Sequence, residues 1–386
     1  MRPLEGLKVL DLTRVLAGPF CGMLLADLGA EVYKVEAPNG DDARGNGPFA
    51  NGESTYFMSL NRGKRSIILD FKDEKHKKVF LDMVKQADIL IENYRPGTME
   101  KLGLGYEEVL KQLNPRLIYC AISGFGQTGP YKTRAAYDII VQAMSGIMSI
   151  TGAKGGEPTR IGSSIGDIIA GLYGVISIEA ALEARHKTGK GQNIDIGMLD
   201  CLVSVLENAI VRYFNTGVSP VPLGNRHPVA TPFDAFKTKK GQLVIGVQNN
   251  SLWERFCKVI AAEELTNDPR FSDNALRTDN VEELKILLEE KLKAKTVDEW
   301  IPPLLEVGIP CGPINDIEAV INDPQIKARN MIVELKGHPV AGDLKFAGNP
   351  MNFSETKCIL ERPAPALGQH TEEILKEFGI TQADYQ

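Results

Sequence analysis

The sequence predicts an α/β fold in which a Rossmann-like domain with a parallel sheet is joined to a smaller α+β domain. The first observation is a strand, a helix and a strand at Leu7–Thr13, Ala17–Leu28 and Glu31–Glu36, the pattern of a right-handed βαβ unit. The second is a later buried strand, Asp88–Glu92, that follows an amphipathic helix. The third is a change of pattern to a hairpin and helices after the proline-rich segment Ser219–Pro232.

The rest of the first domain follows from apolar side chains that recur at strand or helix spacing. The basic segment N-R-G-K-R leads into a strand within Asn61–Lys72. The further predicted elements are a helix at Asp73–Gln86, a strand at Arg116–Ser123, a helix at Tyr137–Ile150, a helix from Asp167 to Arg185, a strand at Asn193–Ile196 and a helix at Met198–Asn215.

The second domain begins with a hairpin whose strands, Phe233–Lys237 and Leu243–Val247, are joined across K-K-G. Its predicted helices are Ser251–Ala261, Val281–Leu292 and Val297–Glu306, and strands at Met331–Leu335 and Asp343–Phe346 lead to a capped helix within Pro363–Gly379. The expected division is therefore a Rossmann-like part over 1–218, a linker over 219–232, a small α+β domain over 233–330 and a return to the large domain over 331–386.

Composition excludes several classes of function. The 386 residues carry a net charge of −6, which argues against a general binder of nucleic acid or anionic membranes. The chain enters its first strand without a signal-peptide pattern, so we expect a cytoplasmic protein. The six cysteines are scattered without a C-x-x-C pair, so we expect reduced cysteines and no metal.

Asp167 is the main candidate for chemistry. It lies where the small residues of I-G-S-S-I-G-D give way to an apolar helix, and the helix terminus should favour its ionised form. One interpretation is an ordinary helix N-cap. The other is a carboxylate nucleophile flanked by glycine N–H groups that stabilise an oxyanion.

Two loops lie at the ends of predicted strands and are candidates for ligand binding. Asn93, Tyr94 and Arg95 follow the strand Asp88–Glu92, where open α/β sheets bind ligands, although a simple N-x-x-P-G turn is the alternative. The segment Gly124–Gly129 matches G-x-G-x-x-G, but Pro130 and a basic loop follow it instead of a helix. The sequence therefore does not support NAD binding.

Taken together, the motifs resemble those of the class III CoA-transferases. The motifs that carry the resemblance, from the first strand to the last helix, are L-K-V-L-D-L-T-R-V-L-A-G-P, N-R-G-K-R-S-I-I-L-D, E-N-Y-R-P-G, S-G-F-G-Q-T-G-P-Y, I-G-S-S-I-G-D, A-L-E-A-R-H-K-T-G-K-G-Q, G-I-P-C-G-P and P-A-P-A-L-G-Q-H-T. The resemblance implies an interlocked homodimer that uses an acyl-CoA and small carboxylic acids as substrates, with no other cofactor. It also implies that Asp167 is the nucleophile, which forms a mixed anhydride and then an aspartyl-CoA thioester.

The same resemblance implies a set of positions that contact coenzyme A: Leu16, Ala17, Leu69, Lys72, Asn93, Tyr94, Arg95, Lys101, Arg134, Ala135 and Tyr137. Cations among them suit the phosphates of coenzyme A. Lys101 stands where several members of the family have Arg. The segment Val247–Asn250 lacks the poly-glycine loop of formyl-CoA transferase, which argues against formate and oxalate as substrates.

Two other functions remain open at this point. The related α-methylacyl-CoA racemases use a His–Asp pair in a G-H-D-I-N-Y-like segment, whereas Ala135–Ile140 here reads A-A-Y-D-I-I. Tyr137 thus replaces the imidazole, and tyrosine is a poor base at neutral pH, which favours transfer over racemisation. A non-catalytic CoA-binding protein is the other alternative, and the intact Asp167 with its glycines argues against it.

Overall fold

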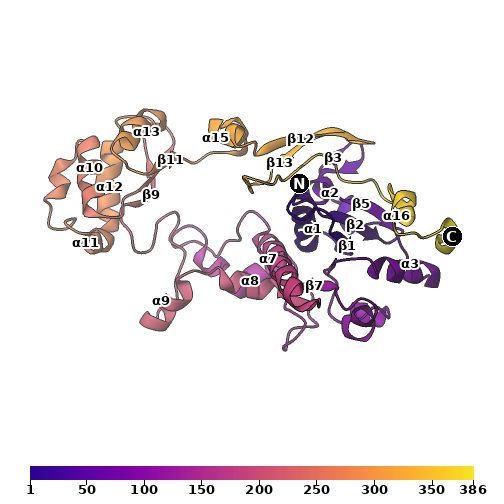
Figure 1. Ribbon diagram of the computed structural model, residues 1–386. Helices are drawn as coiled ribbons and strands as arrows, with labels where there is room; N and C mark the ends of the chain where they lie inside the picture. Colours follow the sequence, from indigo (N-terminus) through magenta and orange to yellow (C-terminus); the bar gives the residue numbers. More distant parts are fainter. The chain divides into compact units, whose positions relative to one another are not determined.

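The structure, a computed structural model, describes residues 1–386, and the chain forms two compact units. Unit 1 contains Met1–Met148, Arg160–Val218 and Pro324–Gln386, and unit 2 contains Ser149–Thr159 and Ser219–Asp323 (Figure 1). The expected linker, residues 219–232, falls within unit 2, as do residues 149–159. Each unit is described by itself.

Unit 1 is built on a six-stranded parallel sheet, which confirms the predicted α/β class. Its strands are β1 (Lys8–Asp11), β2 (Glu31–Glu36), β5 (Arg65–Ile68), β6 (Ile89–Glu92), β7 (Ile118–Ser123) and β8 (Asn193–Gly197). The order is β5-β2-β1-β6-β7-β8, so the strand order reverses between β1 and β6. Open α/β sheets bind ligands outside the carboxyl ends of the strands at such a reversal.

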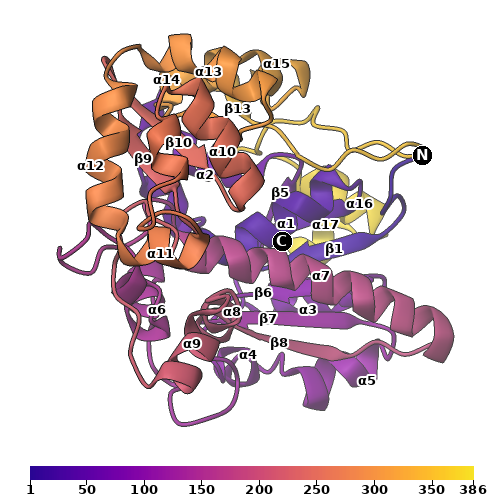
Figure 2. The same ribbon diagram turned by 90° about the vertical axis from the view of Figure 1, so that its left-hand side faces the viewer.

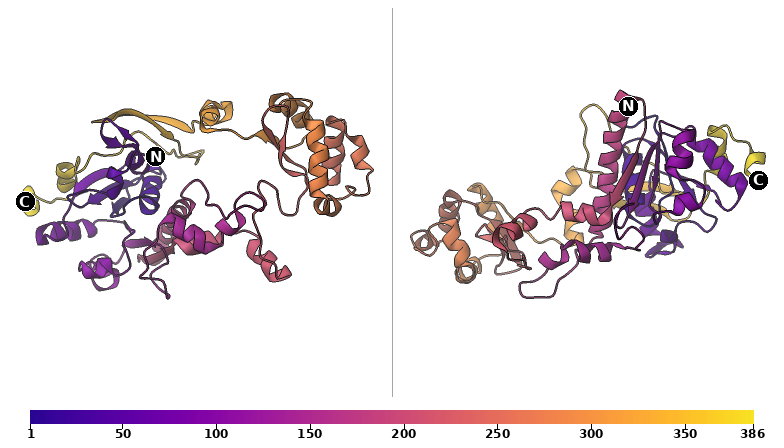
Figure 3. Two further views of the ribbon diagram at one scale, coloured as in Figure 1. Left: turned by 180° about the vertical axis from the view of Figure 1, so that it is seen from behind. Right: turned by 90° about the horizontal axis from the view of Figure 1, so that it is seen from below.

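Helices cover both faces of this sheet. On one face lie α1 (Ala17–Asp27) and α7 (Ile165–Thr188), which contact each other closely (Figure 2). On the other face, α3 (Glu74–Val84), η2 (Tyr106–Leu110) and α16 (Thr371–Glu377) bury apolar side chains against the strands. Figure 3 shows α7, in magenta, across the sheet from α3 and η2, in purple.

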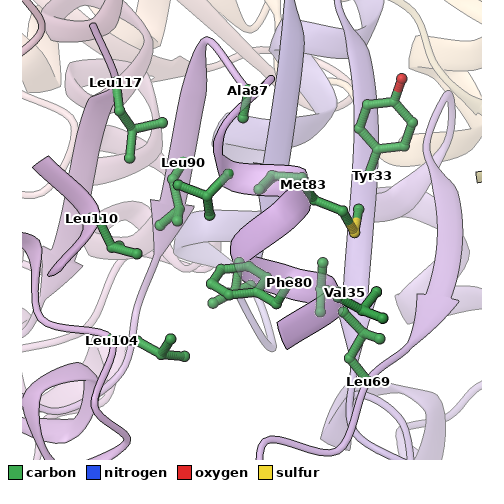
Figure 4. Close-up of a cluster of buried hydrophobic side chains, with 14 of the residues drawn as sticks. Tyr33, Val35, Leu69, Phe80, Met83, Ala87, Leu90, Leu104, Leu110 and Leu117 are labelled. Carbon is green, nitrogen blue, oxygen red and sulfur yellow. The ribbon is translucent and has the colours of Figure 1, made fainter. Parts of the chain in front are cut away.

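The core of the second face draws its side chains from distant parts of the chain. Phe80 and Met83 of α3 pack with strand residues such as Leu90 (Figure 4), and Ile374 and Phe378 from the carboxyl-terminal region belong to the same cluster. Figure 4 shows Phe80 and Met83 extending from α3 among residues of the neighbouring strands. Fully burying one such side chain contributes about 1.5–3 kcal/mol, so the cluster fixes the sheet and α3 together.

Three predicted helices differ from those observed. The helix expected at Tyr137–Ile150 is α6 (Asp138–Ser145) followed by η3 (Met148–Ile150), because Gly146 adopts a φ of 92° and ends the first helix. The helix expected at Met198–Asn215 is α8 (Met198–Ser204) and α9 (Ala209–Thr216), interrupted where Glu207 has a φ of 54°. The third, α7, begins two residues before Asp167.

Helix α2 (Thr55–Asn61) is not among the predicted elements, and its N-cap Ser54 accepts a hydrogen bond from the Phe57 N–H. The remaining elements of unit 1 are η1 (Asp42–Gly45), β3 (Phe49–Ala50), β4 (Glu53–Ser54), α4 (Thr98–Lys101), α5 (Lys111–Leu113), α15 (Pro324–Ala328), β12 (Ile332–His338), β13 (Gly342–Ala347) and α17 (Gln382–Tyr385).

Helix α7 is long and apolar enough, by length and composition, to cross a membrane. Its most apolar 18-residue window has a mean hydropathy of 1.6, and 44% of that window is buried within the structure. The helix packs on α1, α8 and β7, as the core helix of an α/β domain does.

Unit 2 contains a three-stranded antiparallel sheet in the order β11-β10-β9, made of β9 (Phe233–Lys237), β10 (Gln242–Gly246) and β11 (Cys311–Pro313). Its helices are α10 (Asn250–Val259), η4 (Glu263–Thr266), α11 (Asn274–Asp279), α12 (Val281–Leu292), α13 (Val297–Glu306) and α14 (Ile317–Asn322). Trp253, Phe256 and Trp300 lie in its own apolar core, so the unit has the features of a separate domain.

Candidate active site

The main cleft of unit 1 lies at the carboxyl ends of β1, β6 and β7, beside the reversal of strand order. It has a volume of about 270 Å³. Its lining residues come from the turn after β1 and the start of α1, from η1, from the turn after β6, from the end of β7 and the loop after it, and from the first turns of α7 and α8: Arg14, Val15, Leu16, Ala17, Asp42, Asn93, Tyr94, Arg95, Pro96, Ile122, Ser123, Gly124, Lys132, Arg134, Ala135, Ala136, Tyr137, Asp167 and Met198.

Asp167 is the third residue of α7, and the N-cap of that helix is Ser164. The interpretation of Asp167 as an N-cap is therefore wrong. Its carboxylate accepts no hydrogen bond, and burial together with the charge of Asp138 raises its pKa to about 7. The sequence predicts that the helix terminus favours the ionised form of Asp167, whereas loss of solvation and a like charge raise its pKa instead.

Asp138 fastens the start of α7. Its Oδ1 accepts a hydrogen bond from the Gly166 N–H at 2.8 Å, and its Oδ2 accepts one from Gln142 Nε2 at 2.7 Å. Gln142 Oε1 in turn accepts the Ile161 N–H at 2.9 Å. Asp138 is only 8% exposed, so this chain of hydrogen bonds fixes both the loop before α7 and the backbone next to Asp167.

Two of the glycines near Asp167, Gly166 and Gly171, allow helices to pack closely. A Cβ on Gly166 would lie 2.8 Å from Val141 of α6, and one on Gly171 would lie 2.8 Å from the carbonyl oxygen of Ala17 on α1. Side chains at these positions would push α7 away from its neighbours. The Gly166 N–H bonds to Asp138, so it is not available to stabilise an oxyanion, which the interpretation of Asp167 as a nucleophile predicts for the flanking glycines.

The turns after β1 and β6 are joined to each other. Asn93 Oδ1 accepts the Arg14 N–H at 2.7 Å, and Asn93 Nδ2 donates to the Arg14 carbonyl at 2.7 Å. The Arg14 guanidinium pairs with Asp42 at 3.2 Å and lies 5.4 Å from the centre of the Tyr94 ring. Arg14 and Tyr94 line both the main cleft and a second cleft of about 260 Å³, so the two clefts adjoin.

The positions expected to contact coenzyme A are distributed unevenly. Leu16, Ala17, Asn93, Tyr94, Arg95, Arg134, Ala135 and Tyr137 line the main cleft with Asp167. Leu69 and Lys72 line the adjoining cleft. Lys101, the last residue of α4, is exposed and lines neither cleft.

Sequence reasoning missed several residues at this site. Arg14 and Lys132 add cations to the main cleft, and Arg14 lies within the first motif, T-R-V-L-A-G-P, which gave a signal that was not used. Tyr56 of α2 also lies near the nucleophile candidate. Burial and the charges of Asp167, Asp41 and Asp138 raise the pKa of Tyr56 to about 12, and no sequence pattern signals that proximity.

The six cysteines are unpaired, and four of them are buried. Burial raises the pKa of the Cys201 and Cys257 thiols to about 12, so neither is a thiolate at neutral pH. No three His, Cys, Asp or Glu side chains in residues 1–386 converge as metal ligands do.

Comparison with known proteins gives consistent matches over the whole chain. The family CoA-transferase family III matches residues 4–371. The chain is 44% identical over 384 residues to acetyl-CoA:oxalate CoA-transferase of Acetobacter aceti, covering 99% of this chain and 97% of that protein. It is 42% identical over 379 residues to human succinyl-CoA:glutarate CoA-transferase, covering 98% and 86%. A solved CAIB/BAIF family protein from Brucella suis has a TM-score of 0.88 at 42% identity, covering 98% of this chain and 99% of that chain.

Proposed function

The chain belongs to CoA-transferase family III, and we propose that it moves coenzyme A from an acyl-CoA thioester to a free carboxylic acid through covalent intermediates on Asp167. The family membership and the relatives named as CoA-transferases confirm the resemblance found in the sequence. The assignment of Asp167 as the nucleophile goes beyond that membership and is the proposal made here. The observation behind it is a carboxylate without a hydrogen-bond donor, partly buried, in a cleft lined by several cations.

The reaction begins when the ionised Asp167 attacks the carbonyl carbon of the donor thioester. The carbon–sulfur bond breaks, coenzyme A leaves as the thiolate, and an acyl-aspartyl anhydride remains. The thiolate then attacks the side-chain carbonyl carbon of Asp167 and releases the donor acid, which leaves an aspartyl-CoA thioester. The acceptor carboxylate attacks that thioester, and the thiolate released attacks the acceptor acyl carbon of the new anhydride. This last step frees Asp167.

These steps transfer acyl groups between thioesters and anhydrides, and none of them removes a proton from carbon or changes an oxidation state. Coenzyme A therefore enters as a substrate, and we propose that no metal or other cofactor takes part. The pKa of about 7 suits the nucleophile, because a carboxylate of higher basicity is a better nucleophile while still being ionised near neutral pH.

Coenzyme A is best accommodated across the two adjoining clefts. Its phosphates suit the cationic residues Arg14, Arg95, Lys132 and Arg134 of the main cleft and Lys72 of the second, which stand out in a chain of net charge −6. The nucleotide would lie towards Leu69 and Lys72, and the thioester towards Asp167.

The acid substrates belong, in this proposal, to the dicarboxylic acids. The relatives are named for oxalate and glutarate, and a third, from Haloarcula hispanica, for mesaconate at 38% identity. These acids share two carboxylates. Oxalate is included among these acids despite the missing poly-glycine loop, because the relative named for oxalate is 44% identical over nearly the whole of both chains.

We also propose that the enzyme is an interlocked homodimer and that it is cytoplasmic. Large apolar side chains that a monomer would leave in water support the dimer: Val211, Tyr213 and Phe214 of α9, and Ile139, Ile140 and Met144 of α6, are all exposed. Sedimentation over a wide range of concentrations should give a dimer that does not dissociate short of unfolding. A fraction of monomer that increases on dilution at native pH would contradict the proposed dimer.

The test of the nucleophile is to trap the intermediate. Enzyme incubated with succinyl-CoA and treated with hydroxylamine or borohydride should carry the modification on the peptide that contains Asp167. Asp167→Asn should lose both the modification and turnover while still binding coenzyme A. The peptide with Asp138 serves as the internal control and should stay unmodified. Turnover at the normal rate in Asp167→Asn would disprove the assignment.

A further inference from the structure

The turn between β1 and α1 is held by side chains rather than by other backbone. Asp11 Oδ1 accepts the Thr13 N–H at 2.9 Å, and Lys34 Nζ donates to the Thr13 carbonyl oxygen at 2.9 Å. The next residue, Arg14, has both its N–H and its carbonyl bonded to Asn93. Secondary structure supplies none of these bonds.

Asp41 is the fourth side chain that holds the backbone of this turn, after Asp11, Lys34 and Asn93. Its Oδ1 accepts the Val15 N–H at 3.1 Å, and its Oδ2 lies 2.9 Å from Lys34 Nζ. Every backbone polar group from the N–H of Thr13 to the N–H of Val15 is therefore bonded to a side chain. In this arrangement of the turn all five backbone groups are satisfied together.

The conformation that these bonds hold is strained. Val15 has a φ of 68°, in the left-handed region that β-branched residues almost never adopt, because Cβ meets the following carbonyl oxygen. A strained residue persists only where its surroundings determine it completely, and such residues gather at functional sites. A relaxed turn would be favoured if the side chains that hold Val15 were lost.

The ion pair within this set is completely buried. The side chains of Lys34 and Asp41 are both 0% exposed. A buried ion pair contributes little net stability, because removing two charges from water offsets their attraction. Its effect here is on geometry, since Lys34 holds the carbonyl before Arg14 and Asp41 holds the N–H after it.

The residues that this turn orients face the substrate. Arg14, Val15, Leu16 and Ala17 line the main cleft with Asp167, and Arg14 also lines the adjoining cleft. We propose that four side chains form a positioning clamp, which keeps the strained turn in the conformation that binds acyl-CoA. The four side chains of the clamp are Asp11, Lys34, Asp41 and Asn93.

This proposal gives Asn93 a different task from the one its resemblance to the family implies. The amide oxygen and the amide nitrogen of Asn93 both bond to Arg14, so Asn93 acts on coenzyme A through that residue. It is a positioning residue, as are Lys34 and Asp41. None of them needs to contact the substrate to affect its binding.

The clamp predicts an effect on substrate binding that a purely structural role would not produce. If the turn relaxes, only a fraction of the enzyme can bind acyl-CoA, and the apparent KM rises in inverse proportion to that fraction. At saturating acyl-CoA, binding shifts the turn back to its binding-competent conformation. The fall in kcat should therefore be smaller than the rise in KM. A purely structural role would lower the melting temperature and leave KM unchanged.

Two variants open the clamp at different places. Asp41→Ala removes the acceptor of the Val15 N–H, and Asn93→Ala removes both bonds to Arg14. Each should raise the KM for succinyl-CoA by roughly 5- to 30-fold, the range that corresponds to release of left-handed strain. Asn93 is partly exposed, so Asn93→Ala keeps the test available if Asp41→Ala fails to fold.

The decisive measurement is rescue by Val15→Gly. Glycine adopts a positive φ without strain, so in the Asn93→Ala or Asp41→Ala background this change should lower KM back towards the native value. In the native background it should raise KM, because the turn is already held and glycine only adds freedom and removes a side chain from the cleft. Val15→Ala is the matched control, since it trims the side chain but keeps Cβ, and it should give no rescue.

Opposite signs of the Val15→Gly effect in the two backgrounds would establish the clamp. If Val15→Gly raises KM in every background, or if Asp41→Ala and Asn93→Ala fold and keep the native KM, the clamp does not exist. Rescue by Val15→Ala equal to that by Val15→Gly would also overturn it, because the φ of Val15 would then not be the property being corrected.

Discussion

Asp138 accepts the backbone N–H of Gly166 at 2.8 Å, so the carboxylate that caps the first turn of α7 belongs to α6 and lies beside Asp167. Two acidic side chains thus share one helix terminus. Asp138 takes the hydrogen bond that the terminus offers, and Asp167 is left without one. The result is one carboxylate that fixes the backbone and a second that lines the main cleft without a hydrogen bond.

The first prediction concerns pH. Burial and the charge of Asp138 raise the pKa of Asp167 to about 7, and only the ionised form attacks a thioester. The value of kcat/KM for acyl-CoA should therefore rise about tenfold per pH unit below 7 and level off above it. Asp138→Asn keeps an oxygen for Gly166 but removes the like charge, so it should move this rise to lower pH. The pH profile of both enzymes, measured at one ionic strength, checks this, and coincident profiles would contradict it.

The second prediction concerns stability. A carboxyl whose pKa is raised on folding binds its proton more tightly in the native state, so its contribution to stability is lost as pH rises from about 3.8 to about 7. Asp167→Asn removes the free-energy cost of holding an ionised carboxylate at this buried position. The variant should exceed the native enzyme in free energy of unfolding by an amount on the order of a few kcal/mol at pH 8 and match it near pH 4. Denaturant titrations at the two pH values measure the difference, and a variant less stable at pH 8 would show that the burial cost is absent.

The third prediction separates two lysines. Lys72 lines the cleft that adjoins the main one, whereas Lys101 lines neither cleft. Lys72→Gln should raise the KM for acyl-CoA roughly threefold to tenfold, and Lys101→Gln should change it less. An acyl-pantetheine donor lacks the nucleotide phosphates, so with it the two variants should behave alike. Equal effects of the two substitutions on acyl-CoA would mean that the nucleotide lies elsewhere.

The fourth prediction concerns proton transfer at carbon. Tyr137 stands where the racemase motif has its histidine, and the residue is 75% exposed at the edge of the main cleft, with no imidazole beside it in the segment A-A-Y-D-I-I. In deuterium oxide the enzyme should exchange coenzyme A between acids without placing deuterium on the α-carbon of a 2-methylacyl-CoA. Mass spectrometry of the recovered thioester gives the answer, and fast deuteration without acyl exchange would show that Asp167 acts as a base.

Much of unit 1 was predictable because its signals are local. The alternation of strands and helices and the right-handed crossovers gave the parallel sheet, and the residues after Asp88–Glu92 were expected in the crevice and do line the main cleft. Lys34 shows what local sequence signals cannot predict. It lies in the strand pattern V-Y-K-V-E as an ordinary cation, yet it is fully buried because Asp41, from a loop that no periodicity describes, pairs with it.

The same limit explains the errors at Asp167. The sequence shows that a helix starts near this residue, but not that Asp138 from another helix supplies the carboxylate at its terminus. The break between α8 and α9 was missed for a related reason: the apolar pattern continues through Val205 and Leu206, and only the backbone reveals the left-handed Glu207. Contacts between distant segments decide both features.

The core under the second face of the sheet has a consequence for how the protein is made. Ile374, Leu375 and Phe378 belong to the same apolar cluster as Leu10 and Tyr33. A ribosome adds those three residues only after all of unit 2 has been synthesised. The strands β1 and β2 at the start of the chain thus keep apolar surface uncovered while about 340 further residues are synthesised. During this interval the nascent chain is open to chaperones and to aggregation, and unit 2, whose core is nearly continuous in sequence, can fold before unit 1 closes.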